Sequence, residues 1–307
     1  MITALAGGIG ASKLLKGLVE IIKEEDLNIV VNTGDDIEVH GLHISPDLDI
    51  VMYTLAGIVD PKKGWGIKED IFNCLEMLGK YGLQTWFNLG DKDLATHIYR
   101  TYLLKNGYTL SEITKKICKS LGVKVNILPM SDDKVQTIIF TDKGNMHFEE
   151  YLIKRQSQDK VLDVKFEGIE KSRPAKGVIN SILKSHTVIL CPSNPIVSIN
   201  PILSVPGIRK ALKTTKAKVI GVTPIIGGTA IKGPADKLMR GLGFEVSPYG
   251  VALLYHDFLD NFIIDNIDEK KKNQIENLGI KVKSTNTIMK NNTDKVRLAR
   301  EILNTTK

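Results

Sequence analysis

Residues 2–13 read ITALAGGIGASK, an apolar run that leads into a glycine-rich turn and then into a helix-forming segment. Residues 2–6 predict a buried strand, residues 12–23 an amphipathic helix and residues 27–31 a second buried strand. Short apolar strands that alternate with helices in this way form βαβ units, in which the strands are parallel. This stretch therefore predicts an open α/β sheet.

The same alternation continues along the chain and returns in its last third. A further helix is predicted at residues 48–58. Strands are predicted at residues 186–191, 217–222, 262–265 and 280–282, and helices at residues 207–212, 235–241, 270–278 and 294–303. The fold class that we expect is α/β, with a Rossmann-like, doubly wound and mostly parallel sheet covered on both faces.

The pattern changes between residues 62 and 172. Three consecutive helices are predicted at residues 69–79, 91–105 and 109–121, and β segments at residues 125–128, 135–141 and 146–154. No repeat or Ser/Gly linker separates this region from the rest. We expect one Rossmann-like domain over residues 1–307, with residues 62–172 as an inserted helical and β subdomain that caps the carboxyl edge of the sheet.

The composition is that of an ordinary soluble globular protein, with 42% hydrophobic and 25% charged residues in 307. No run of about 18 apolar residues is present, so a membrane span is not expected. The first residues lack a basic segment ahead of their apolar run, which favours a buried strand and not a signal peptide. We therefore expect a cytoplasmic location. Cys74, Cys118 and Cys191 stand far apart, so we expect neither disulfides nor a zinc site.

The net charge of +7 comes from 42 basic and 35 acidic residues, and most of the lysines are scattered singly. A nucleic-acid groove needs clustered cations interleaved with stacking aromatics, whereas only 6% of the residues are aromatic. Nucleic acid is therefore not an expected partner. A modest positive field suits small anionic, phosphorylated substrates.

A glycine-rich loop, Gly7-Gly8-Ile9-Gly10-Ala11-Ser12-Lys13, follows the first predicted strand. Glycines allow close backbone approach, and the start of the next helix offers free N–H groups to a phosphate. Lys13 stands where a dinucleotide fingerprint requires Gly or Ala, and no GxxxxGK[ST] motif is present. The loop predicts a nucleotide or phosphate site, and a plain strand-to-helix turn is the alternative.

Four aspartates, Asp35, Asp36, Asp47 and Asp49, follow the second strand on two neighbouring loops. Mg²⁺ prefers carboxylate oxygens and keeps waters and substrate phosphates as its other ligands, so one aspartate from each loop would form a shared site. The alternatives are that Asp47 caps a helix and that Asp35 binds a ribose. Between the two loops stands an HxxH pair at residues 40–43, which is only a weak indication of metal binding.

Polar loops also follow later predicted strands. Residues 86–97, WFNLGDKDLATH, place aromatics beside charged groups, which suits a planar ligand with a polar tail; the alternative is that the aromatics are core and Asp91 only a cap. Residues 191–199, CPSNPIVSI, are rigid and rich in small polar groups. Lys232 and Lys237 would neutralise phosphate as point charges.

Six long motifs together resemble one known family. They are NTGDDIEVHGLHISPDLD, KKGWGIKEDIFN, WFNLGDKDLATHIYRT, ILPMSDDKVQT, CPSNPIVSINPILSVPGIR and IIGGTAIKGPADKLM. They closely resemble the 2-phospho-L-lactate transferase (CofD) family of coenzyme F-420 biosynthesis, over residues 7–265. That resemblance implies a dimeric, Mg²⁺-dependent enzyme that transfers phospholactate from lactyl-2-diphospho-5′-guanosine to the deazaflavin alcohol Fo and releases GMP.

The resemblance also implies roles for residues. The guanosine diphosphate would be held by Gly7, Gly8, Gly10, Ser12, Lys13, Ser193, Asn194 and Ser198. The deazaflavin and its ribityl tail would be held by Asp49, Asn88, Lys92 and Thr96. Our hypothesis for the chemistry is that Asp35 or Asp36, together with Asp49, holds the metal and that Asp49, Asp47 and Asp36 are catalytic, with Asp47 or a neighbouring carboxylate orienting or deprotonating the hydroxyl.

Three alternatives to this function remain open from the sequence. Some bacterial relatives use an enolpyruvyl donor, which differs from the lactyl donor by one oxidation step. A family with a similar frame, the YvcK-type proteins, resembles a nucleotide-sugar-binding regulator without turnover. A nicotinamide-dependent oxidoreductase is favoured by the glycine loop and by the acid after the second strand, but the missing third glycine and the abundance of carboxylates argue against it.

Overall fold

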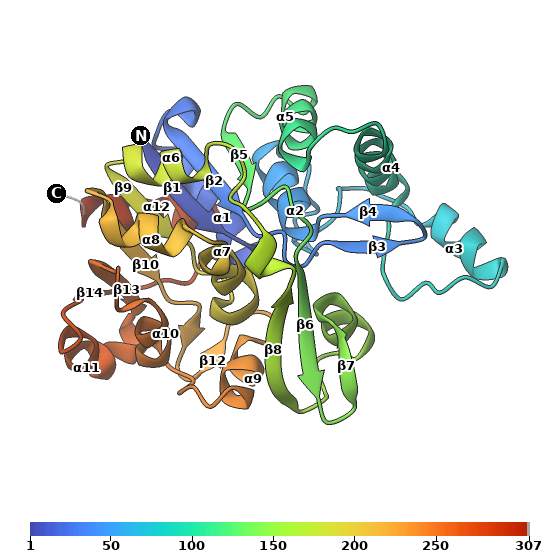
Figure 1. Cartoon of the computed structure of the whole chain (residues 1–307). Helices are drawn as coiled ribbons and strands as arrows, with labels where there is room; N and C mark the ends of the chain where they lie inside the picture. The colour runs from blue at the N-terminus through green and yellow to red at the C-terminus, as the bar shows by residue number, and fades with distance from the viewer. Residues whose placement is uncertain (306–307) are drawn as a thin grey trace.

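The computed structural model describes residues 1–305 and has a seven-stranded parallel sheet at its centre (Figure 1). The strand order is β14-β13-β10-β9-β1-β2-β5. These strands are β1 (Ile2–Ala6), β2 (Leu27–Val31), β5 (Asn126–Pro129), β9 (Thr187–Leu190), β10 (Lys218–Val222), β13 (Asn261–Asp265) and β14 (Lys281–Thr285). The expected doubly wound α/β class is confirmed.

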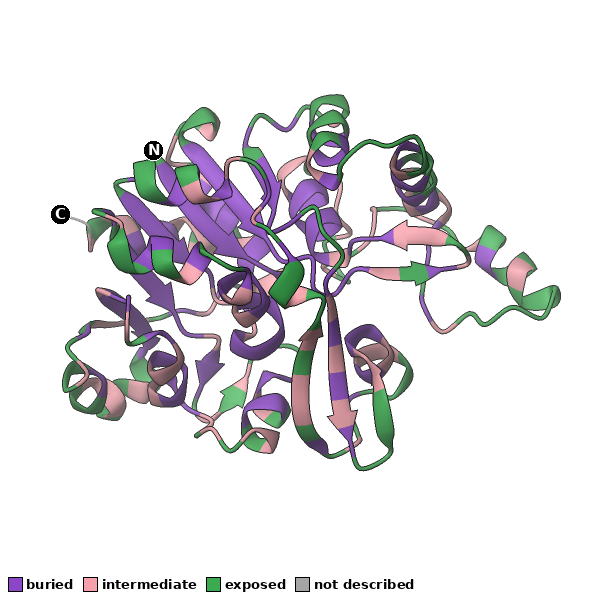
Figure 2. Cartoon of the chain, viewed as in Figure 1, coloured by how far each residue is buried: buried purple, intermediate pink, exposed green. Residues whose placement is uncertain are grey.

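Helices cover both faces of the sheet. The first face carries α1 (Gly8–Val19), α2 (Pro46–Leu55), α5 (Leu110–Ser120) and α12 (Asn292–Asn304). The second carries α6 (Val178–Lys184), α7 (Asn200–Ser204), α8 (Ile208–Thr214), α9 (Ala235–Gly241), α10 (Pro248–Tyr255) and α11 (Lys272–Glu276). Alternate strand residues divide between the two cores, so Leu5 faces one and Ala6 the other. The central strands are consequently buried on both sides (Figure 2).

The direction of strand addition reverses at β1. The chain moves outward from β1 to β2 and later to β5, and it then returns to the other side of β1, where β9 pairs in parallel with it. In open α/β sheets the ligand crevice lies beyond the carboxyl ends of the strands at such a switch point. The loops that follow β1, β2 and β9 are therefore the place to look for a site.

The region between residues 62 and 172 comes in separate pieces. Its helical part is α3 (Asn73–Lys80), α4 (Asp91–Lys105) and α5, and its sheet part is an antiparallel flap of β6 (Gln136–Thr141), β7 (Gly144–His147) and β8 (Val161–Glu167), in the order β7-β6-β8. Between them β5 joins the central sheet beside β2. Residues 125–128, expected within the insertion, therefore extend the main sheet.

Some local expectations are corrected. The segment at residues 146–154 was expected to be β, but only its start is strand, and residues 150–154 form a π-helical turn, Glu150–Lys154. Short elements were also missed, among them the hairpin of β3 (Ile37–Val39) and β4 (Leu42–Ile44) and the two-stranded pair β11 (Ile225–Ile226) and β12 (Thr229–Ala230). Within residues 1–305, no helix combines the length and apolarity needed to cross a bilayer.

Candidate active site

Three loops converge at the carboxyl end of β1. Gly7 precedes α1 with extended backbone, and its N–H donates to Ser193 Oγ over 3.2 Å. A Cβ on Gly7 would lie 2.6 Å from Asp47 Oδ2 and 2.7 Å from Ser198 Cβ, and one on Gly10 would lie 2.2 Å from the Pro192 carbonyl oxygen. Only glycine permits this approach. The structure thus brings together the glycine loop, the loop after β9 and the first turn of α2.

The other residues predicted on the nucleotide side have local roles. Ser12 Oγ donates to the Ile9 carbonyl oxygen over 3.0 Å, and Asn194 Oδ1 accepts from the Ile196 N–H over 3.0 Å at the start of a π-helical turn, Pro195–Ile199. Lys13 Nζ donates to the Met289 carbonyl oxygen over 3.4 Å. These contacts build the walls around the glycine loop.

Lys232 and Lys237 lie in different parts of the structure. Lys232 Nζ donates to the Lys63 carbonyl oxygen over 3.1 Å, and burial together with repulsion from Lys13 lowers the pKa of the Lys232 ammonium. Lys232 therefore joins Lys13 near the glycine loop. Lys237 Nζ instead donates over 2.7 Å to the carbonyl oxygen of Ser157, which lies in the segment between β7 and β8 of the flap.

Asn32, the residue directly after β2, connects these loops. Its Nδ2 lies 2.9 Å from Asp47 Oδ2, 3.0 Å from Asp35 Oδ2 and 3.1 Å from the Val197 carbonyl oxygen. The Gly8 N–H also hydrogen-bonds Asp47. Asp47 lies in the first turn of α2, where a negative charge stabilises the helix, and it contacts the glycine loop at the same time. The alternative that Asp47 caps the helix is wrong, because Ser45 is the N-cap residue and the Asp47 carboxylate contacts Asn32 and the Gly8 N–H.

The carboxylates in this cluster repel one another. Burial raises the pKa of Asp47 to about 6, against the hydrogen bonds from Asn32 and Gly8, and Asp36 adds repulsion. Burial raises the pKa of Asp35 well above its ordinary value, and the charges of Asp47 and Glu149 raise it further. The site therefore holds more acidic groups than it can keep ionised without a proton or a cation.

Glu149 is a member that the sequence did not reveal. It follows β7 of the flap, is 5% exposed, and has its pKa raised to about 8 by burial, with further repulsion from Asp47 and Asp36. Its position depends on the flap folding over the loop after β2, where a Cβ on Gly34 would lie 2.8 Å from Thr137 Oγ1 of β6. No spacing or motif in the sequence pairs Glu149 with the aspartates.

Asp36 has partners on both sides. Its Oδ2 accepts from Ser45 Oγ over 2.8 Å and lies 2.9 Å from His43 Nε2, and its carbonyl oxygen lies 3.2 Å from His147 Nε2. Burial raises the pKa of the Asp36 carboxyl, while His43 and Ser45 oppose that rise. His40 lies in the turn between β3 and β4 with a φ of 53°. His43 is therefore a hydrogen-bond partner of Asp36.

Asp49 occupies a different environment from the other three aspartates. Arg100 of α4 donates to both of its carboxylate oxygens, Nη1 to Oδ2 over 3.1 Å and Nη2 to Oδ1. The two side chains are almost fully buried; burial lowers the pKa of Arg100, but the charge and hydrogen bond of Asp49, with Tyr53 and Asp36, raise it overall. Asp49 is thus held by an internal cation on the side of α2 that faces the helical insertion.

The predicted metal ligands fit Mg²⁺ only in part. Asp35 Oδ1 and Asp36 Oδ1 are buried and have no hydrogen-bond partner among the described residues, as expected for oxygens that await a cation. Residues 1–305 contain no group of three or more His, Cys, Asp or Glu side chains placed to hold an ion. Mg²⁺ binds through one or two carboxylates plus water and phosphate, so Asp35 and Asp36 suit it, whereas Asp49 already pairs with Arg100.

The residues predicted on the acceptor side are spread along α4 and the segment before it. Asn88 is exposed, and Lys92 Nζ donates to the carbonyl oxygens of Lys68 over 3.1 Å and Glu69 over 2.9 Å. Thr96 is half-buried and hydrogen-bonds Tyr53. Of these three, only Thr96 contacts a residue next to Asp49 within the buried interface of α2 and α4.

The aromatic pair before α4 belongs to a small core. Trp86 and Phe87 pack edge to face, with ring centroids 5.6 Å apart, and Phe87 is buried with apolar residues of β3, β4 and α4. The segment carries no strand, although one was expected to end there. Asp91 Oδ1 accepts from the Cys74 N–H over 3.1 Å and so supports the start of α3.

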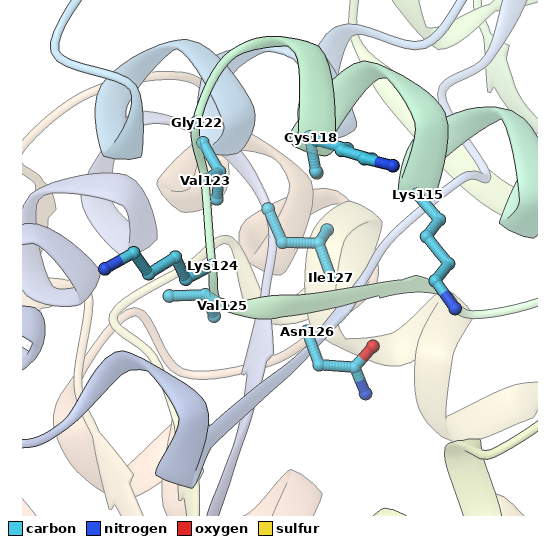
Figure 3. Close-up of a pocket in the computed structure, with 9 residues that line it drawn as sticks. Lys115, Cys118, Gly122, Val123, Lys124, Val125, Asn126 and Ile127 are labelled. Carbon is cyan, nitrogen blue, oxygen red and sulfur yellow. The ribbon is translucent and has the colours of Figure 1, made fainter.

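A hollow of about 420 Å³ lies elsewhere, between α5 and the start of β5 (Figure 3). Lys115, Cys118 and Lys124 are among its lining residues. Since it is at the amino end of β5, it lies at the sheet edge opposite to the glycine loop. It shares no residue with the carboxylate cluster.

The whole chain matches one protein family. The model of the family "2-phospho-L-lactate transferase CofD" matches residues 2–302. A 2-phospho-L-lactate transferase of Methanosarcina acetivorans is 44% identical over 93% of this chain and 92% of its own length. That of Methanocaldococcus jannaschii is 41% identical over 99% and 97%, and a phosphoenolpyruvate transferase of Streptomyces griseus is 38% identical over 98% and 97%. The chain therefore belongs to the CofD family, and the three relatives named above are transferases.

The fold also matches a solved structure. A member of the UPF0052 family from Bacillus halodurans superposes with a TM-score of 0.64 at 17% identity and covers 98% of each chain. At this identity the likeness concerns the fold. It places the α/β frame and its appended elements together in one known architecture.

Proposed function

We propose that this CofD-family chain transfers the 2-phospho-L-lactate group from lactyl-2-diphospho-5′-guanosine to Fo, giving coenzyme F-420-0 and GMP in a Mg²⁺-dependent reaction in the cytoplasm. The observation that carries the proposal is the contact of Asp47 with Asn32 and the glycine loop at the switch point of the sheet. It puts a buried acid beside N–H groups at a helix start, where a phosphate would bind.

On the donor side, the glycine loop and the loop after β9 would hold the guanosine diphosphate. Backbone N–H groups at the start of α1 favour anions, and Lys13 and Lys232 add positive charge close by. Ser193 and Ser198 line the same junction, where Gly7 approaches both of them. This wall suits a leaving nucleotide monophosphate, because its growing charge would meet fixed donors.

Asp35 and Asp36 would hold Mg²⁺ through their unpartnered oxygens. When bound, the ion would neutralise charge on the phosphates of the donor. Asp47 would accept a proton from the ribityl hydroxyl, since its pKa of about 6 keeps it mostly ionised near neutral pH and basic enough to take a proton. Asp36 would orient this end of the site through Ser45 and His43.

On the acceptor side, Asp49 with Asn88, Lys92 and Thr96 would bind the deazaflavin and its ribityl chain. Support for Asp49 comes from its burial as a charged side chain at the interface between α2 and α4. A carboxylate whose two oxygens each accept one hydrogen bond retains lone pairs for the hydroxyls of a sugar-like chain. Asp49 and Asp47 lie in one helical turn, so the two sides of the site share α2.

We also propose that the chain forms a homodimer, and that its other partners are the two small-molecule substrates. The helices α3 and α4, with the residue that follows α3, carry large apolar side chains that are at least 40% exposed. They are Met77, Tyr81, Ile98, Tyr99 and Tyr102. Figure 1 shows α3 at the end of the molecule farthest from the central sheet. An apolar face of this kind is typical of a surface that another chain covers.

The second candidate donor is enolpyruvyl-2-diphospho-5′-guanosine. It is favoured by the match to phosphoenolpyruvate transferases, which at 38% and 39% identity are only slightly more distant than the 2-phospho-L-lactate transferases at 40% to 44%. The UPF0052 structure shares the fold at 17% identity and does not favour a regulator without turnover.

The test compares the two donors with the purified protein, Fo and Mg²⁺. The mass of the deazaflavin product distinguishes a lactyl from an enolpyruvyl adduct. We expect a higher kcat/KM with the lactyl donor. Preference for the enolpyruvyl donor would keep the site and change the substrate, whereas tight nucleotide binding without any product would favour the regulator.

A further inference from the structure

Arg100 is the largest side chain that the fold buries almost completely, and it lies in the insertion instead of the α/β frame. It is 1% exposed and donates to both oxygens of Asp49. A buried charge of this kind is costly unless it is paired, so its presence needs a reason beyond packing. Its Nε is buried and has no hydrogen-bond partner among the described residues.

A row of polar side chains stands behind this ion pair. Arg100 Nη1 lies 3.3 Å from His97 Nδ1, and the His97 ring places Nε2 3.3 Å from Asp93 Oδ1. Tyr53 of α2 donates to the same Asp93 oxygen over 2.7 Å. His97 is 1% exposed. The row therefore begins and ends on α2 and passes through α4, with His97 Nε2 at ion-pair distance from Asp93 but without a hydrogen bond among the described residues.

We propose that Arg100 is a positioning residue for acceptor binding, which holds the Asp49 carboxylate in one orientation, and that His97 and Asp93 hold Arg100 in turn. This inference rests on the proposed function, because it takes Asp49 to bind the ribityl chain of Fo. It goes further by assigning the affinity for the acceptor, and not for the donor, to a residue of the inserted helix α4.

The geometry explains why the residue is arginine. The planar guanidinium presents two parallel N–H groups to the two carboxylate oxygens, whereas a lysine ammonium is a point charge that cannot fix the carboxylate plane. Asp47, two residues earlier, takes its hydrogen bonds from Asn32 and Gly8 and faces the glycine loop. A change at Arg100 should thus disturb Asp49 and spare the donor side.

The experiment measures equilibrium binding and steady-state kinetics for Fo and for the guanosine donor with Arg100→Lys. We expect the Kd and KM for Fo to rise by about tenfold to a hundredfold, since small misplacements of a binding group have effects of this size, while the KM for the donor stays within about twofold. In an Asp49→Asn background, the Arg100→Lys change should add less than about twofold, because it acts through Asp49.

Arg209→Lys is the matched control. Arg209 also makes a two-pronged pair, with Nε 3.0 Å from Asp257 Oδ2 and Nη2 2.6 Å from Oδ1, but on α8 and away from the carboxylate cluster. It should lower thermal stability without changing the KM for Fo. A structural role of Arg100 would instead give a similar loss of stability with an unchanged ratio of the two KM values.

Asp93→Asn serves as the second variant, in case Arg100→Lys does not fold. It should raise the KM for Fo by about threefold to tenfold and leave the KM for the donor unchanged. An Fo affinity within twofold of the wild type in the folded variants overturns the inference and leaves the proposed function standing. Failure of the wild-type protein to bind Fo at all overturns both.

Discussion

Asn32 Nδ2 lies 2.9 Å from Asp47 Oδ2, and this hydrogen bond joins the end of β2 to the first turn of α2. The same amide lies 3.0 Å from Asp35 and 3.1 Å from the Val197 carbonyl oxygen, so one side chain connects both acidic loops to the loop after β9. The uncharged amide of Asn32 therefore links the loops of the candidate site by hydrogen bonds.

Asn32→Ala should reduce both stability and turnover. Its removal leaves buried acceptors without a donor, which costs about 1–3 kcal/mol in the free energy of unfolding. The pKa of Asp47 should rise further, because the Asn32 hydrogen bond opposes the effect of burial. Urea unfolding and the pH profile of kcat measure the two effects. An unchanged acidic limb of that profile would contradict the role of Asn32.

Asp47→Asn and Asp49→Asn should behave differently although the residues share one helical turn. Asp47→Asn removes a charge from a cluster of like charges, so the fold should persist while turnover falls by about a hundredfold or more. Asp49→Asn leaves Arg100 buried without its carboxylate and should cost about 3–5 kcal/mol of stability. Thermal unfolding beside turnover assays separates them; equal losses of stability would contradict the assignment of Arg100 to Asp49 alone.

Glu149 should make stability fall as the pH rises. The pKa of Glu149 in the folded protein is raised from 4.5 to about 8. Its contribution to the free energy of unfolding is therefore complete below about pH 4.5 and is lost progressively as the pH rises from there to about 8. Glu149→Gln removes this dependence and should make the protein more stable than the wild type at pH 8.5, by up to about 4 kcal/mol, with little difference at pH 4.5. Melting temperatures across this range give the comparison, and parallel curves for the two proteins would rule out the buried position of Glu149.

Mg²⁺ should stabilise the wild-type protein even without substrate. A cation near Asp35 and Asp36 offsets the repulsion within the cluster, and ligand binding at a hundred times its Kd adds about 2.7 kcal/mol. The rise in melting temperature on adding Mg²⁺, and its reversal by a chelator, should disappear in Asp35→Asn. Asp257→Asn, which changes an aspartate on another face, is the control and should retain the rise. A rise that persists in Asp35→Asn would move the metal away from this residue.

The sequence predicts the frame of this protein well because its signal is local. Residues 2–6 and 27–31 are apolar except for Thr3 and Asn28, and the structure has strands at those bounds. The helix at residues 91–105 also begins and ends where its pattern predicts. Residues 125–128 were harder to place, because a short apolar run has the same appearance in the central sheet and in a flap.

The site was predictable where glycines, prolines and acids follow strands, and not where contacts join distant segments. The loops that contain Gly7, Asp47 and Ser198 follow or border predicted elements, so their convergence follows from the topology of a parallel sheet. The pairing of Arg100 with Asp49 spans 51 residues and depends on how α4 packs on α2. Glu149 likewise reaches the cluster only because the flap packs on the loop after β2, and the sequence predicts β segments in the flap but not where they pack.

We propose that this site transfers a phospho-acid group from a guanosine diphosphate diester to a deazaflavin alcohol. The most direct measurement is GMP release from lactyl-2-diphospho-5′-guanosine, with and without Fo and with and without Mg²⁺, while the deazaflavin product is followed by mass. We expect one GMP for each phospholactyl deazaflavin formed, and release only when both Fo and Mg²⁺ are present. GMP release at the same rate without Fo, or no release from either the lactyl or the enolpyruvyl donor, would contradict it.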